Sequence, residues 1–121
     1  MNDEELTLSL AEFWAWLMTH PNCILRAGTP ETVVYDDPDV HWGFGTEESE
    51  TLVIQAIRGK RPLGEILVAP EQVAWVRGFT GEMDGEYIFE MMAESDTEPF
   101  AAYFFVMTHG LDEEDASAKV H

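Results

Sequence analysis

Three residues at alternate positions, Asp37, Asp39 and His41, are the first candidates for chemistry in this chain. In an extended segment such residues point to one side, with successive side chains about 6 to 7 Å apart. Two carboxylates and an imidazole in that arrangement could bind a divalent metal ion. However, Asp36 and Pro38 interrupt the series, and Asp-Asp-Pro-Asp is a typical turn composition. We therefore expect a solvated turn here, with a metal site as the alternative.

A second acidic triplet, Glu82, Asp84 and Glu86, surrounds Gly81 and Gly85. Carboxylate oxygens are ligands that Ca²⁺ prefers, so a weak calcium site is one interpretation. An EF-hand loop needs more regularly spaced oxygens and a final bidentate Glu, and this segment lacks that pattern. We therefore predict a hairpin loop at 82–86. For the protein as a whole, we expect no cofactor.

The single cysteine, Cys23, lies three positions after His20. A Cys–His nucleophile pair needs thiolate character, which usually comes from a helix N-terminus or a cationic neighbour. Cys23 instead follows a predicted helix C-terminus and is flanked by Ile24 and Leu25. We therefore predict a buried structural cysteine.

Two glutamates, Glu65 and Glu90, lie within apolar segments, where burial could raise a carboxylate pKa toward general-acid use. We expect both instead to occupy the solvent face of half-buried strands. The sequence carries no serine-nucleophile, dinucleotide-binding, phosphate-loop, zinc-protease or Cys-x-x-Cys motif. A non-enzymatic protein is therefore favoured over an enzyme.

The net charge restricts the partners of the protein. The chain has 24 Asp and Glu against six Lys and Arg, a formal charge of −18 in 121 residues. A small soluble domain needs a charge of only about 2 to 8 in magnitude. Nucleic acids and anionic lipids are polyanions, so direct binding to nucleic acid or to a membrane is disfavoured. A basic protein would be attracted instead. The acids gather at predicted turns: 36–39, 47–50, 82–86, 94–98 and 112–115.

Two other features could contact a partner. Arg58, Lys60 and Arg61 are three of the six basic residues and fall at a predicted hairpin tip. This basic tip could anchor a phosphate, an acidic patch of a partner or a second copy, or it could simply be a soluble loop. Trp16 lies at the edge of a helical apolar stripe, where it could pack at the core edge or form an interface hot spot. The sequence is also compatible with a homodimer.

The elements that must position these residues begin with a helix. Ser9 and Glu12 form a Ser-x-x-Glu capping box, with Ser9 as the N-cap. Pro21 disfavours α geometry at His20, so the helix should end there. The apolar residues recur at the helical period of 3.6 and form one stripe. The stripe comprises Leu10, Phe13, Trp14, Leu17 and Met18.

Short runs rich in β-branched and aromatic residues follow, separated by Gly, Pro and Asp. They predict strands near 22–28, 31–36, 40–45, 51–58, 63–69, 72–79, 86–93 and 100–108. The last run is apolar on both faces, so 98–109 is either a central strand or a buried helix. Four aromatic residues and an expected hairpin with 86–93 favour the strand. The polar tail, 112–121, is predicted to be a short helix or a frayed end.

We therefore predict one α+β domain over residues 1–121: an N-terminal helix packed on a curved antiparallel sheet of about five to seven strands. A small β-barrel with an appended helix is the alternative. A single cysteine, an acidic N-terminus unlike a secretory signal and the lack of an 18-residue apolar run together indicate the cytoplasm.

The function that we favour is an acidic binding protein that acts on a basic protein, as a polyanion mimic, an inhibitor or an immunity-type protein. A mimic would need its acids on one face. The candidate contacts are acidic residues of two turns and one tryptophan: Asp36, Asp37, Asp39, Glu82, Asp84, Glu86 and Trp16.

Two alternatives remain open. The first is a small-molecule binder or small enzyme with an aromatic-lined pocket between helix and sheet. Its lining would come from Trp14, Trp42, Trp75, Tyr87 or Phe104. The second is an acidic domain whose charge is only an adaptation to a salty environment.

Overall fold

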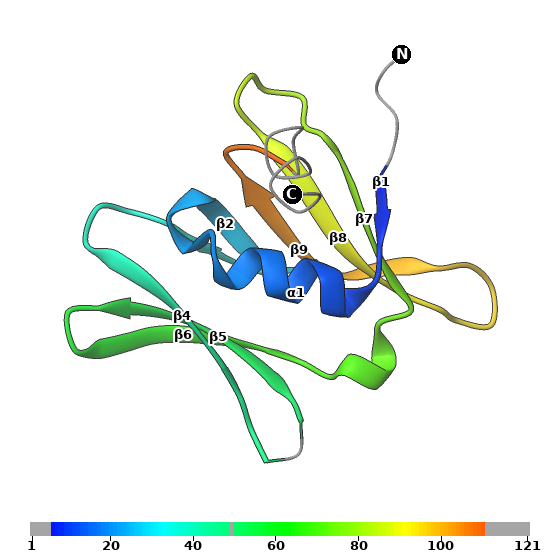
Figure 1. Ribbon diagram of the computed structural model, residues 1–121, viewed down its shortest axis with the longest axis horizontal. Helices are drawn as coiled ribbons and strands as arrows, with labels where there is room; N and C mark the ends of the chain where they lie inside the picture. The colour runs from blue at the N-terminus through cyan, green and yellow to red at the C-terminus, as the bar shows by residue number, and fades with distance from the viewer. Residues whose placement is uncertain (1–5, 49, 111–121) are drawn as a thin grey trace, which may run out of the picture.

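Figure 1 shows the computed structural model, which describes residues 6–48 and 50–110. These residues form nine strands, one α-helix and two short 3₁₀ helices. In chain order the elements are β1 (Leu6–Leu8), α1 (Leu10–Met18), η1 (Pro21–Cys23), β2 (Ile24–Thr29), β3 (Thr32–Tyr35), β4 (Val40–Thr46), β5 (Leu52–Arg58), β6 (Arg61–Val68), η2 (Pro70–Gln72), β7 (Trp75–Thr80), β8 (Tyr87–Ala93) and β9 (Phe100–Met107).

Helix α1 starts with the predicted capping box. The Glu12 N–H donates to Ser9 Oγ at 3.1 Å, and the Ser9 N–H donates to Glu12 Oε1 at 2.9 Å. The helix ends at Met18, two residues earlier than predicted, because the last turn before Pro21 changes from four-residue to three-residue hydrogen bonds. The N–H groups of Thr19 and His20 bond to carbonyls three residues back, at 3.1 and 2.9 Å.

The strands form two antiparallel sheets where one was predicted. Sheet A has six strands in the order β1-β7-β8-β9-β2-β3, and sheet B has three in the order β4-β5-β6. The fold is thus broadly α+β, and the described residues form no closed barrel. The prediction missed β1, which has only three residues. It also extended two strands into 3₁₀ turns: 22–28 overlaps η1, and 72–79 overlaps η2, each of which begins with a proline.

The segment that the sequence left open between strand and helix is strand β9. It is central in sheet A, paired with β8 on one side and β2 on the other. This position explains why its residues are apolar on both faces. The predicted hairpin with 86–93 is confirmed, with Glu90 opposite Phe104 in the register.

One hydrophobic core joins α1 to both sheets. The Phe13 ring centroid lies 4.7 Å from that of Phe89 and 5.5 Å from that of Phe105, both in sheet A. Trp14 makes an edge contact with Phe44 of sheet B at 5.7 Å. Figure 1 shows α1 lying across one face of sheet A, with sheet B beside it. None of the described helices has the length and apolarity needed to cross a membrane.

Candidate functional site

An open groove of about 690 Å³ lies where η2 meets the ends of β8 and β9. It is lined by Glu71, Gln72, Ala74, Ala93, Glu94, Phe100 and Ala102. The register Ala93↔Phe100 fixes one wall, because these residues pair at the end of the β8–β9 hairpin. The Ala74 N–H donates to the Met92 carbonyl at 2.7 Å and ties the exit of η2 to β8. We call this feature the acidic groove.

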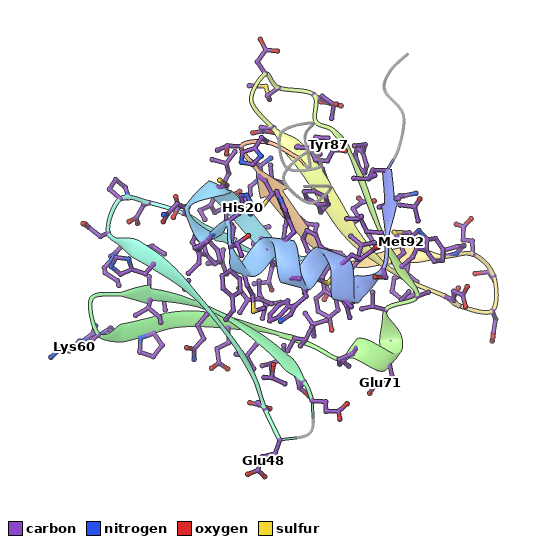
Figure 2. The ribbon with its side chains drawn as sticks, in the orientation of Figure 1. His20, Glu48, Lys60, Glu71, Tyr87 and Met92 are labelled. Atoms are coloured by element: carbon purple, nitrogen blue, oxygen red, sulfur yellow. The ribbon has the colours of Figure 1, made fainter. Side chains whose placement is uncertain are left out.

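Two glutamates from segments that are distant in sequence line the acidic groove. Glu71 lies on η2, where Figure 2 labels it, and Glu94 follows the end of β8. None of the described residues that line the groove is Lys, Arg or His. Phe100 is 50% exposed and adds an aromatic surface beside the two acids. A cationic side chain would therefore meet negative charge and an aromatic ring together.

The loop beside the acidic groove carries more acid and is internally bonded. Asp96 and Glu98 are exposed in this loop, which joins β8 to β9. Ser95 Oγ donates to the Glu98 carbonyl at 2.6 Å and accepts the Glu98 N–H at 3.2 Å. These bonds hold the loop next to the groove in a defined turn.

Of the residues suggested as a metal site, Asp37 has both carboxylate oxygens bonded to other groups. Asp37 Oδ1 accepts the Asp39 N–H at 2.8 Å, and Asp37 Oδ2 accepts from Arg58 at 2.7 Å. The Asp39 N–H, and then Arg58, hold the pKa of Asp37 below its usual value. Asp36 Oδ1 accepts from the Trp42 indole at 3.0 Å. Asp39 and His41 are exposed, and no group of three or more possible ligands gathers anywhere in the described part of the chain. The segment has the bonding of the predicted turn.

The triplet at 82–86 forms the loop between β7 and β8. Gly85 has a φ of +80°, a backbone conformation that favours glycine. Arg26 donates to both carboxylate oxygens of Glu86, at 3.1 and 3.4 Å. Glu82 and Asp84 are exposed. The predicted hairpin loop is therefore present, with one of its three acids already paired.

The acidic turns do not gather on one side of the molecule. Figure 1 places the turns between β3 and β4, β4 and β5, β7 and β8, and β8 and β9 at separate corners. The fifth predicted turn, 112–115, lies outside the described residues, as does the tail 112–121. Two acids from segments distant in sequence, Glu71 on η2 and Glu94 after β8, do line the same groove.

Cys23 meets a histidine that is distant in sequence. Its Sγ lies 3.2 Å from His109 Nε2, whereas the spacing had suggested His20. His109 Nδ1 lies 2.9 Å from the Gly110 carbonyl, which can only accept, so Nδ1 donates this bond. Cys23 is half-buried, which corrects the prediction of a buried cysteine. The Thr108 N–H also donates to the Cys23 carbonyl at 2.8 Å, so the contact joins η1 to the end of β9.

The aromatic residues suggested for a pocket do not converge. Trp42 is buried at 8% exposure, and Tyr87 packs beside Phe89 on the core face of sheet A. Trp75 and Phe104 alternate with the core residues of their strands and so face the opposite side. Trp16 is only 4% exposed and packs in the core, which matches the packing role of the two roles that the sequence allowed.

The remaining candidates lie on exposed surface. The basic tip is the β5–β6 turn, where Arg58 is paired with Asp37 and both Lys60 and Arg61 are exposed. Figure 2 shows Lys60 on the opposite side of the molecule from Glu71. Glu65 is exposed and accepts from Gln55 at 2.7 Å, and Glu90 pairs with Arg77 at 2.8 Å. Both glutamates thus have the ordinary surface role that the sequence analysis expected.

Comparisons with protein-family models, with curated proteins and with solved structures gave no match to this chain.

Proposed function

We propose that this protein is a non-enzymatic, acidic binding protein that recognises a basic segment of a protein partner through the acidic groove. The observation that carries the proposal is the convergence of Glu71, Glu94 and the half-exposed Phe100 around one groove of about 690 Å³. A Lys or Arg side chain fits this chemistry, because carboxylates accept its hydrogen bonds and the ring interacts with its charge.

The net charge and the groove contribute in different ways. A charge of −18 attracts a basic partner from a distance and raises the association rate. Long-range attraction alone does not select one orientation, whereas a groove with two acids and a ring does. Because the acidic turns point to separate corners, an inhibitor or immunity-type role with a local docking site fits better than a polyanion mimic. We further propose a cytoplasmic location, which agrees with the free thiol of Cys23.

The proposal is tested by fluorescence anisotropy with a labelled arginine-rich peptide and a glutamate-rich peptide as the control ligand. The variant Glu71→Gln/Glu94→Gln removes both carboxylates of the groove. Since exposed ion pairs contribute about 0.2 to 1 kcal/mol each, we expect its affinity to fall by roughly two- to thirtyfold. The matched control, Glu82→Gln/Asp84→Asn, removes the same charge from another exposed turn. Its affinity should change less than about twofold, because a salt solution near 0.15 M screens charge beyond about 8 Å.

Two results would contradict the proposal. If neither peptide binds at low salt, the protein does not recognise basic segments. If both double variants weaken binding equally, net charge alone drives the association and the groove is not the site.

A further inference from the structure

Sheet A has a second face, turned away from α1, whose composition differs from the rest of the surface. Residues opposite one another on antiparallel strands point to the same side. The registers Arg26↔Tyr35, Arg26↔Val106, Val106↔Ile88 and Ile88↔Phe79 therefore place one row across five strands. A second row contains Val33, Phe104, Glu90 and Arg77. We call these two rows, with Glu86, the outer face.

The outer face is electrically neutral in a strongly acidic protein. Its two arginines are each paired with a glutamate: Arg26 with Glu86 at 3.1 Å, and Arg77 with Glu90 at 2.8 Å. Its other members are uncharged. A basic partner would be drawn to the acidic turns rather than to this face. Two molecules that each carry −18 can approach closely only where neither presents net negative charge.

The shape of the outer face also suits a second copy. A hollow of about 390 Å³ lies on it, lined by Arg26, Pro30, Ile88, Glu90, Ala101, Phe104 and Val106. Next to the hollow, on the edge strand β3, Tyr35 is 66% exposed and Val33 is 39% exposed. Tyrosine is enriched among the residues that dominate interface energies. The face thus carries both an exposed aromatic side chain and a depression lined mainly by apolar residues.

We propose that the outer face is the interface of a symmetric homodimer in which Tyr35 of each copy enters the hollow of the other. A two-fold interface uses the same patch on both copies. The projecting Tyr35 of each copy can therefore fill the hollow of the other, so the same contact forms twice. The arrangement also leaves the acidic groove open, since the groove lies at the end of the β8–β9 hairpin.

The size of the face sets the expected affinity. The outward side of these five strands as a whole, with strands about 4.8 Å apart and about six residues each at about 3.3 Å, measures roughly 24 by 20 Å and includes the two rows. This footprint of roughly 500 Å² is smaller than the area of about 800 Å² per partner in a standard interface. We therefore expect a dissociation constant in the micromolar range and a dimer that forms at high protein concentration.

Salt dependence separates this proposal from the proposed function. Added salt screens the repulsion between two acidic chains, so dimerisation should strengthen as the salt concentration rises. Binding of a basic peptide in the acidic groove should weaken under the same change. The variant Glu71→Gln/Glu94→Gln should leave the dimer intact, because neither residue belongs to the outer face.

The test is sedimentation velocity from about 1 to 200 µM protein at low and high salt, a range that brackets micromolar dissociation. Wild type should form a dimer that is strengthened by salt. Tyr35→Glu and Val33→Glu should each weaken it by roughly tenfold or more, because each adds an unpaired charge to the interface. Leu67→Glu is the matched control: Leu67 is 48% exposed on sheet B, and this variant should remain dimeric. Circular dichroism of each variant checks that it is folded. Because Tyr35 and Val33 are both exposed, the test can still be made with one variant if the other fails to fold.

Three outcomes would overturn the proposal. The first is a wild type that stays monomeric at every concentration and salt level. The second is self-association that salt weakens, which would indicate an attractive charge contact such as the basic tip of one copy in the acidic groove of another. The third is a dimer that survives both Tyr35→Glu and Val33→Glu.

Discussion

Replacing Phe13 by alanine tests whether α1 is the element that holds the core together. Phe13 is fully buried, and its ring packs against Phe89, Phe105 and Trp16 at centroid distances of 4.7, 5.5 and 6.2 Å. Truncating a buried phenylalanine to alanine costs about 3 to 5 kcal/mol, which includes the cavity left behind. Because single domains are stable by only about 5 to 15 kcal/mol, this loss is a large share of the total.

The assay is urea unfolding followed by tryptophan fluorescence, which reports on Trp16 beside the substituted residue. With a loss of about 4 kcal/mol and a denaturant slope of about 2 kcal/mol per M, the midpoint should fall by about 2 M urea. Met18→Ala is the control on the same helix, because Met18 is 45% exposed, and its midpoint should change by less than about 0.5 M. A Phe13→Ala midpoint within about 0.5 M of wild type, or an equal loss in Met18→Ala, would refute this account of the core.

Local features of the sequence predicted local structure well. The capping box at Ser9 and Glu12 depends on residues three positions apart, and it forms as predicted. The alternation of apolar residues located most strands, and the apolar run from Phe100 to Met107 became the central strand β9. The capping box and the apolar patterns depend only on residues close together in sequence, so they can be recognised without knowing the rest of the fold.

The division into two sheets could not be predicted in the same way. Strand β2 pairs with β9 across most of the chain, and β1 pairs with β7, so neighbours in the sheet are distant in sequence. The candidate site has the same origin. The bond from the Ala74 N–H to the Met92 carbonyl ties the exit of η2 to β8, and Glu71 and Glu94 line the groove at this junction. The Cys23–His109 contact joins residues 86 positions apart, so spacing alone pointed to His20 instead.

Three further predictions concern stability. Ser9→Ala should cost about 1 kcal/mol in thermal unfolding, because the Glu12 N–H loses its partner at the helix start, and an unchanged melting temperature would contradict the role of the cap. The pKa of Asp37 is lower in the folded protein than its ordinary value of 3.8. The ionised carboxylate therefore stabilises the fold fully above pH 3.8, and this stabilisation is lost as the pH falls through the lower, folded-state pKa. Asp37→Asn should therefore lower the melting temperature near neutral pH and converge with wild type in acid; a constant difference would argue against the Asp39 and Arg58 contacts. Burial raises the pKa of Tyr87 above its ordinary value of 10.0. The neutral hydroxyl therefore contributes fully to folding stability below pH 10.0, and this contribution is lost as the pH rises through the raised pKa. Wild type should thus lose more stability than Tyr87→Phe in strong alkali, and parallel losses would count against burial of the hydroxyl.

The most direct test of the proposed function is a titration of the isotope-labelled protein with an arginine-rich peptide, followed by amide chemical shifts. The largest shift changes should fall at 71–74 and 93–102, on the two sides of the acidic groove. These changes should also shrink as salt is added, because the contact is charged. Shift changes that are largest at 36–39 or 82–86, or that spread evenly over all acidic turns, would contradict a docking site at the groove.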